Sequence, residues 1–129
     1  MDNSEAHIAK LVRDLAHPEV YNRKHAAWTL ARIAQKGGAE AAVKAEAVPK
    51  LAACLEDSEL VVRYRALWAL LELAKRGQKT AVLEAGVVKM ISGMVADETE
   101  VEVCHPHSDE VVFTQIGTLA REVLELLQI

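Results

Sequence analysis

The sequence feature that most limits the fold of this chain is a repeat of about 40 residues. From Val61 to Gly77 the apolar residues have the spacing of one amphipathic helix, and the closing glycine is a typical helix stop. When this segment is moved back by 40 positions, Trp68 falls on Trp28, and further pairs match: Arg63 with Arg23, Ala66 with Ala26, Leu70 with Leu30, Leu73 with Ile33, Ala74 with Ala34, Arg76 with Lys36 and Gly77 with Gly37. Self-similarity at a fixed period of this length indicates stacked helical repeats, that is, an α-solenoid.

A shorter apolar pattern repeats with nearly the same period and predicts a second helix in each repeat. It begins at Ile8, Val48 and Val87, so the copies are 40 and 39 residues apart. The period then breaks, because residues 97–108 contain four acidic residues, a proline and no helical stripe. We expect an inserted acidic loop there, followed by a helix over about 109–127 that caps the stack, since terminal repeats are commonly atypical.

These patterns predict an all-α fold in a single domain that covers residues 1–129, with the repeat helices at about 4–36, 39–76 and 79–127. Ser4 and Ser58 precede helical stripes and are expected to be N-caps. Gly93 interrupts a predicted helix at a cost of about 1 kcal/mol relative to alanine. We interpret this glycine as a point where two helices approach closely. Cys54 falls in a helical stripe, and we expect a small core residue rather than a reactive thiol.

The composition supports closely packed helices. Hydrophobic residues make up 51% of the chain but aromatic residues only 4%, so that alanine, leucine and valine must fill the core. The net charge of −4 disfavours a nucleic-acid partner that is held through its phosphates. Two cysteines are too few for a disulfide framework, and no apolar run approaches the roughly 20 residues that cross a bilayer. Because the first residues also lack signal-peptide features, we expect an intracellular, cytoplasmic protein without membrane contact.

The order of a short helix, a middle helix and a long helix that carries A-x-W-x-L resembles the armadillo repeat. The short helix reads GQKTAVLEAG at Gly77–Gly86, the middle one VVKMISGMVAD at Val87–Asp97 and the long one VVRYRALWALLELA at Val61–Ala74. An earlier copy reads GAEAAVKAEA, VPKLAACLED and NRKHAAWTLARIA, and the resemblance covers about residues 4–97. The closely related HEAT repeat has a similar pattern. The resemblance implies a right-handed superhelix of about two and two-thirds repeats with a C-terminal capping helix. The long helices would line its concave groove.

The resemblance also implies which residues contact a partner. In peptide-binding armadillo proteins, a tryptophan on each long helix packs against the ligand, and an asparagine four residues later bonds the main chain of the ligand. Trp28 and Trp68 match the tryptophan position, whereas Arg32 and Glu72 stand at the asparagine position. We therefore do not expect the row of hydrogen bonds from asparagines to the main chain of the ligand that armadillo proteins of the nuclear-import type form. We hypothesise instead that Arg32 and Glu72 pair across the groove. We expect the tryptophans to be exposed in the groove; the alternative is burial between repeats.

Four further residues are candidates for the rim of this groove. Tyr21 and Lys24 lie one to two turns before Trp28, and Tyr64 and Arg65 lie about one turn before Trp68. Such residues would favour an acidic or aromatic partner. The alternative is a solvated helix face, which is the commoner role of such charges.

Catalysis and metal binding have little support in the sequence. Cys104, His105 and His107 are of residue types that bind zinc, but their spacing matches no known finger, and we predict neither a metal nor a cofactor. Phosphate-binding and hydrolase motifs are lacking. We therefore predict a non-catalytic module that binds a partner protein or peptide in its groove. The alternatives are a self-assembling homo-oligomeric solenoid and, more remotely, a HEAT-like enzyme that acts on nucleic-acid bases.

Overall fold

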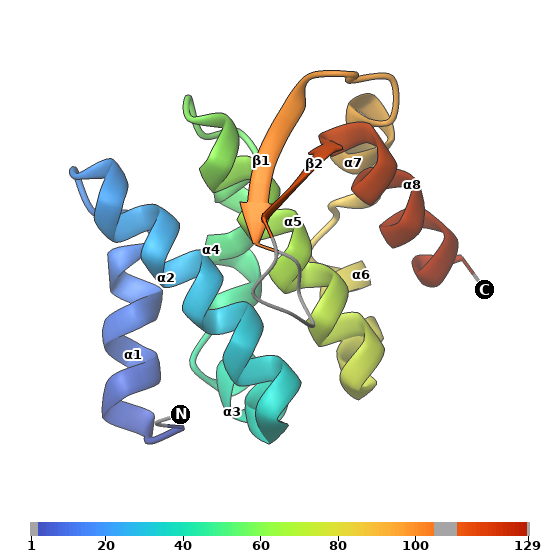
Figure 1. The fold of residues 1–129 in the computed structure, drawn as a ribbon. Coiled ribbons are helices and arrows are strands. Elements are labelled where there is room, and N and C mark those ends of the chain that lie inside the picture. The colour runs from blue at the N-terminus through green and yellow to red at the C-terminus, as the bar shows by residue number, and fades with distance from the viewer. Residues whose placement is uncertain (1–2, 105–110, 129) are drawn as a thin grey trace.

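Helices dominate the structure, a computed structural model that describes residues 3–104 and 111–128 (Figure 1). Its elements in chain order are α1 (Glu5–Asp14), α2 (Val20–Ile33), the π-type turn η1 (Ala34–Gly38), α3 (Ala39–Lys44), α4 (Ala47–Cys54), α5 (Leu60–Leu73), the second such turn η2 (Ala74–Gln78), α6 (Lys79–Glu84), α7 (Val88–Met94), β1 (Glu100–Cys104), β2 (Val111–Gln115) and α8 (Ile116–Leu127).

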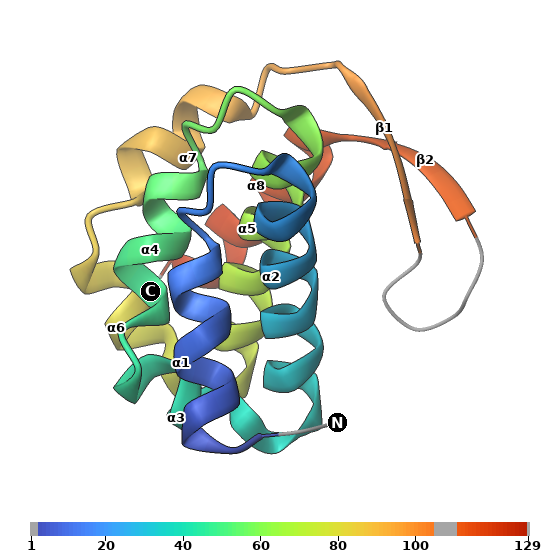
Figure 2. The ribbon, with the colours of Figure 1, turned by 90° about the vertical axis from the view of Figure 1, so that its left-hand side faces the viewer.

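The helices form two layers, as expected for an α-solenoid. The long helices α2, α5 and α8 lie side by side in one layer, and α5 contacts both of its neighbours. Helices α1, α4 and α7 pack behind them, each against the long helix of its own repeat (Figures 1 and 2). The core lies between the layers and is built from small and branched residues, among them Ile8, Leu30, Leu51, Leu70, Ile91 and Ile116. None of the helices in the described ranges is long and apolar enough to cross a membrane.

The 40-residue period is visible in the backbone as well as in the sequence. Gly37 and Gly77 lie in η1 and η2, the turns that follow α2 and α5, with φ angles of 95° and 88°, in the left-handed region that a glycine adopts without strain. Glu46 has a φ of 65° at the position where the next repeat has Gly86 at 70°. Equivalent turns therefore have the same backbone conformation even where the residue type differs.

The N-cap residue of α5 is Glu59, not Ser58 as the sequence predicted, and no described side chain caps this helix. Helix α5 begins one residue after Glu59, whose N–H donates to Asp57 Oδ1 at 2.9 Å. The Asp57 carboxylate thus accepts from a backbone N–H two residues ahead, in the geometry of an Asx turn, and orders the chain just before the helix. The same contact recurs one period earlier, from Glu19 N to His17 Nδ1 at 3.0 Å, and one period later, from Thr99 N to Asp97 Oδ1 at 2.9 Å. The N-cap predicted at Ser4 is confirmed by a 3.3 Å bond from His7 N to its hydroxyl.

Asp57 also fastens the first repeat to the second. Arg23 on α2 donates to both carboxylate oxygens of Asp57, at 2.8 and 3.3 Å, and also to the carbonyl oxygens of His17 and Pro18. The side chains are only 17% and 10% exposed. Burial would raise the pKa of Asp57, but the hydrogen bonds from Arg23 and from Glu59 N, with the nearby positive charges, hold that pKa below its ordinary value.

The acidic segment that we expected to be a loop contains a strand. Strand β1 pairs antiparallel with β2, in a register that runs from Glu100 opposite Gln115 to Cys104 opposite Val111. The expected helix over 109–127 therefore begins only at Ile116. Residues 100–103 alternate glutamate and valine, and residues 111–114 are β-branched or aromatic. Both patterns are typical of strands, and neither has the spacing of apolar residues that predicts a helix.

Close backbone approach occurs at Gly117 and not at Gly93, where we had expected it. A Cβ atom at Gly93 would meet no atom within 4 Å. A Cβ atom at Gly117 would lie against the carbonyl oxygens of Val95 and Asp97, the latter at 2.7 Å. Gly117 N donates to that Asp97 oxygen at 2.9 Å, so that α8 begins in direct contact with the end of α7.

Cys54 is a core residue, as predicted. It is 4% exposed, and its thiol donates to the carbonyl oxygen of Leu15 at 3.5 Å. Burial, together with the charge of Asp57, raises the pKa of this thiol to about 11. The thiolate is therefore scarce at neutral pH, and the residue links α4 to the end of α1 without being reactive.

The two glycines give a matched pair of stability predictions. We expect Gly93→Ala to raise the free energy of unfolding by about 0.5–1 kcal/mol, because alanine restricts the unfolded chain and fits the helix. Gly117→Ala should lower it by about 1–3 kcal/mol, because the methyl group is forced onto backbone oxygens. Urea denaturation of both variants measures the difference, and equal effects would contradict this assignment of the close contact.

Asp57→Asn gives a prediction about pH. Because the pKa of Asp57 is lowered in the folded chain, its carboxylate stabilises the fold at pH values above the ordinary pKa, and this contribution is lost as the pH falls. At pH 7 the variant should unfold several degrees below wild type. The difference should begin to shrink below about pH 4, where the unfolded carboxyl becomes protonated, and should be lost once the pH falls through the lowered pKa of the folded carboxyl. Glu56→Gln, at an exposed position, serves as the control, and a difference that persists unchanged at low pH would refute the mechanism.

Candidate functional site

The residues that the sequence singled out for partner binding lie on the two central long helices. We define the α2–α5 face by these eight residues: Tyr21, Lys24, Trp28 and Arg32 on α2, and Tyr64, Arg65, Trp68 and Glu72 on α5. Two hydrogen bonds tie its halves together, from Arg65 Nη1 to the Lys24 carbonyl oxygen at 3.1 Å and from Gln35 Nε2 to Glu72 Oε2 at 3.1 Å. The structure thus brings the predicted residues onto one pair of adjoining helices.

Trp28 is half-buried and has one accessible side. The guanidinium carbon of Arg32 lies 5.7 Å from the centre of the indole, within the range of a cation–π contact. A half-buried aromatic ring beside a cation is a typical contact surface in protein interfaces. Trp28 is therefore half-buried against the core rather than fully exposed, and its role as a contact residue stays a prediction.

Trp68, by contrast, is only 4% exposed, and the expectation that it would be open to solvent is wrong for this structure. It differs from Trp28 because α5 has a long helix on each side, α2 and α8, and because β1 also lies against it. Within the described part of the chain, Trp68 Nε1 has no hydrogen-bond partner. A buried indole N–H normally has an acceptor, so this donor needs an explanation.

Arg32 and Glu72 are connected through a third residue in place of the direct pair that we expected. Arg32 Nη1 donates to Gln35 Oε1 at 3.2 Å, and Gln35 Nε2 donates to Glu72 Oε2 at 3.1 Å. Sequence reasoning missed Gln35, although its position three residues after Arg32 places both on one helix face. The asparagine positions of the armadillo pattern thus carry a continuous polar chain across two repeats.

The Glu72 carboxylate is buried with one oxygen poorly satisfied. The residue is 1% exposed, and Oε1 lies 3.6 Å from Arg76 Nη2 but accepts no hydrogen bond among the described residues. Burial of a carboxylate is costly unless its lone pairs are used. Glu72 and Trp68 lie one helical turn apart on α5, so two residues of the face that follow one another along this helix each have a buried polar atom without a hydrogen bond among the described residues.

The rim residues differ in their surroundings. Tyr21 is 64% exposed; its ring stacks on that of His25 at a centroid distance of 5.9 Å, and Lys24 Nζ lies 6.0 Å from the ring centre. Tyr64 is half-buried, and burial together with the charge of Glu122 on α8 raises its pKa. The α2 side of the face is therefore open and cationic, whereas the α5 side is closed.

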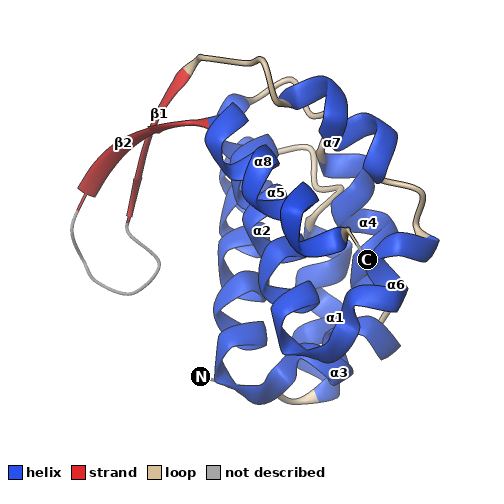
Figure 3. Cartoon of the chain, turned by 90° about the vertical axis from the view of Figure 1, so that its right-hand side faces the viewer, coloured by secondary structure: helices blue, strands red, loops and turns tan. Residues whose placement is uncertain are grey.

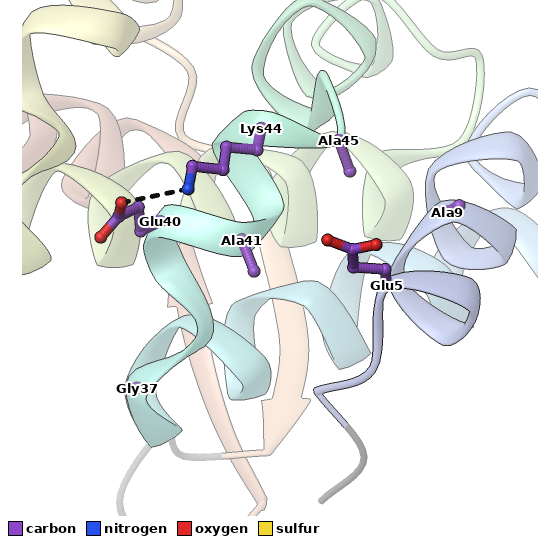
Figure 4. A pocket seen from close by; sticks show the side chains of 7 residues that line it. All are labelled: Glu5, Ala9, Gly37, Glu40, Ala41, Lys44 and Ala45. Atoms are coloured by element: carbon purple, nitrogen blue, oxygen red, sulfur yellow. Dashed lines mark ion pairs between the residues drawn. The ribbon is translucent and has the colours of Figure 1, made fainter.

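Among the cavities that the described residues line, two are near these helices, and neither of the two is the predicted groove. A cavity of about 640 Å³ opens between α1 and α3 (Figure 4), lined by Glu5, Ala9, Gly37, Glu40, Ala41, Lys44 and Ala45. It contains one exposed ion pair, Lys44 with Glu40 at 3.5 Å, and no arrangement that suggests chemistry. A shallower cavity of about 290 Å³ lies between η1 and η2 and is lined in part by Gln35 and Arg76, the two neighbours of Glu72.

The weak metal candidates fall at the edge of the described part of the chain or beyond it. His105 and His107 lie outside the described residues, as does the side chain of Cys104. Among the histidine, cysteine, aspartate and glutamate side chains that the structure does describe, no three come together as metal ligands.

Glu72→Gln gives a prediction about the site. Because the carboxylate is buried and incompletely paired, we expect the neutral amide to raise the free energy of unfolding by about 1 kcal/mol while the bond from Gln35 is kept. Glu40→Gln, at an exposed ion pair, should change it by less than about 0.5 kcal/mol. Chemical denaturation measures both. A strong destabilisation by Glu72→Gln would mean that the charge is well compensated.

Comparisons with known proteins agree with the helical-repeat architecture. Two crystal structures of engineered proteins, each a target of the Northeast Structural Genomics Consortium, are similar to this chain. The first has a TM-score of 0.72 and 21% sequence identity, and the match covers 94% of this chain and 43% of that protein. The second has a TM-score of 0.74 and 23% sequence identity, and the match covers 95% of this chain and 27% of that protein. The chain thus spans less than half the length of either protein, and the likeness shows the fold alone. No curated protein sequence matches the chain.

A family model matches nearly the whole chain, over residues 2–120. This match and the solved structures support a HEAT-like helical repeat, the close relative of the armadillo repeat. The matched family is described as non-SMC mitotic condensation complex subunit 1, Cnd1. The chain belongs to this family.

Proposed function

We propose that this chain is a non-catalytic interaction scaffold that binds an extended segment of a partner protein on the α2–α5 face. The observation that carries the proposal is the pair of buried polar atoms on α5 that make no hydrogen bond: Trp68 Nε1, and Glu72 Oε1, which lies in an ion pair with Arg76 Nη2 at 3.6 Å. The family description supports the general role, because it names a subunit of a complex and therefore a protein with protein partners.

The two atoms have the chemistry that a peptide main chain would satisfy. Each peptide unit offers one carbonyl acceptor and one N–H donor. A carbonyl could accept from Trp68 Nε1, and an N–H or a cationic side chain could donate to Glu72 Oε1. Each bond would remove the cost of an unsatisfied buried group, so the gain on binding exceeds that of an exposed hydrogen bond.

The scaffold holds these groups in place before a partner arrives. Helix α5 is fixed by α2 and α8, and Gln35 fixes one oxygen of Glu72. Pre-organisation of this kind lowers the entropy cost of binding. Trp28, Tyr21 and Lys24 would extend the contact along α2, and the net charge of −4 favours a protein partner over a nucleic acid.

We also propose that the repeat is of the armadillo type within the broader HEAT-like class. The support is the order of a short, a middle and a long helix, which occurs in α3, α4 and α5 and again in α6, α7 and α8. The second of these repeats has the hairpin between its middle and long helices.

Affinity capture tests the proposed function. We expect wild type to retain a partner from a lysate of the source cells, and Tyr21→Ala/Trp28→Ala to lose at least nine-tenths of it. These two side chains lie on the accessible side of α2, so the fold should survive, which circular dichroism checks. Glu40→Ala/Lys44→Ala on α3 is the matched control and should retain the partner. Equal capture by all three chains, or capture of the chain itself alone, would place the function elsewhere or in self-assembly.

A further inference from the structure

One face of helix α2 points outward from the fold. The helix belongs to the layer of long helices, with α1, α4 and α7 on the other side of that layer (Figure 3). The outward face consists of five residues that lie within about 100° of one another around the helix axis, and we call them the α2 stripe: Tyr21, Lys24, His25, Trp28 and Arg32. Each of them is exposed or half-buried, whereas the residues on the remaining arc from position 26 onward are buried: Ala26, Ala27, Thr29, Leu30, Ala31 and Ile33.

The α2 stripe consists of two pairs of an aromatic ring and a cation. Near the start of the helix, the Tyr21 ring stacks on His25 with 7° between the ring planes, and Lys24 Nζ lies 6.0 Å from the Tyr21 ring centre. Eight residues after Lys24, the Arg32 guanidinium lies over the Trp28 ring. In the ranges that the structure describes, Lys24 takes part in no ion pair.

The charge of the chain is unevenly distributed. Helices α2 and α5 together have five lysine or arginine residues and one acidic residue, the buried Glu72, and α2 has no acidic residue at all. Their formal charge is therefore +4, and because the whole chain has −4, all other residues together have −8. A positive area on an otherwise acidic protein favours an anionic partner and steers it to that area.

We propose that the α2 stripe sets the specificity of the α2–α5 face, and that the partner segment it binds is acidic and extended. This inference rests on the proposed function and adds the chemistry of the partner. Carboxylates would accept charge-assisted hydrogen bonds from Lys24 and Arg32, and an apolar side chain would pack on the ring of Trp28.

The spacing of the stripe fits such a segment. Lys24 and Arg32 are eight residues apart on a helix, which is about 12 Å. In an extended chain, side chains four residues apart point to the same side and are about 13 Å apart. Two acidic residues with this spacing therefore match both cations. The residue midway between them points to the same side and meets Trp28, which is midway between Lys24 and Arg32.

A protein segment fits the stripe better than a nucleic acid does. The positive charge is confined to two helices, and the formal charge of −8 on the other residues would repel a long polyanion that extends beyond them. A short segment with two carboxylates can lie within the positive area.

Fluorescence anisotropy with a synthetic peptide tests this inference. The probe is fluorescein-labelled Ser-Glu-Thr-Leu-Thr-Glu-Ser, which has two glutamates four residues apart and a leucine midway. Wild type should bind it at least tenfold more tightly than the same peptide with glutamine in place of both glutamates. Lys24→Glu, which turns attraction into repulsion, should raise the Kd at least tenfold. Lys50→Glu makes the same change of charge at an exposed position on α4 and should raise it less than twofold.

Three results would overturn the inference. If wild type binds the glutamate and glutamine peptides equally, or binds neither, the face does not recognise acidic residues; this comparison needs no variant. If Lys24→Glu and Lys50→Glu, both folded by circular dichroism, have the same Kd, the peptide binds elsewhere on the chain. If a 20-base-pair DNA duplex binds wild type more tightly than the glutamate peptide at the same salt concentration and loses its binding in Lys24→Glu, the stripe binds nucleic acid instead.

The same peptides separate this inference from the proposed function. Equal binding of the two peptides that Tyr21→Ala/Trp28→Ala abolishes would refute the acidic preference and leave the proposed function intact. Binding that depends on the glutamates and on Lys24, together with equal capture from the lysate by all three chains of the capture experiment, would leave the preference of the stripe intact while the proposed function fails.

Discussion

Helix α5 is enclosed by other elements over most of its circumference. It contacts α2 on one side, α8 on the other, α4 behind and β1 in front. Its residues from Ala66 to Ala74 are all buried, without the polar stripe of a surface helix. The two layers, both repeat junctions and the hairpin meet at this helix, so the rest of the fold depends on its packing.

This enclosure explains the electrostatics of the α2–α5 face. A residue that would be an outward-facing contact in a more open repeat is in the interior here, which is why Glu72 is 1% exposed and bonded to Gln35. The same constraint places the Trp68 indole N–H where water does not reach it. Both groups add to the cost of folding. Retention of such a cost is more typical of functional positions than of structural ones.

The repeat junction is held in a different way, by polar contacts at the turns. Arg23 reaches from α2 to the Asp57 carboxylate, and Arg63 bonds the Asp57 carbonyl oxygen at 2.7 Å. The turn at Asp97 repeats the local geometry of the Asp57 turn, and there too the pKa of the carboxyl lies below its ordinary value, chiefly through hydrogen bonds from Thr99. After this turn, however, the chain enters a strand and not a helix. The insertion therefore keeps the turn of the repeat and places a hairpin between that turn and the long helix α8.

The sequence by itself determined the period, the helical layers, the helix stops at Gly37 and Gly77, and the core position of Cys54, because these depend on residues close together in the chain or on a pattern that recurs. It could also have indicated the strands, since the Glu-Val alternation of residues 100–103 is local. Only the tertiary structure decided that Trp28 is accessible while its equivalent Trp68 is buried, and that Gln35 stands between Arg32 and Glu72. The physical reason is that equivalent positions in a repeat have the same local conformation but different neighbours. A middle helix has a neighbour on each side, and the hairpin adds a third, whereas periodicity describes each helix alone.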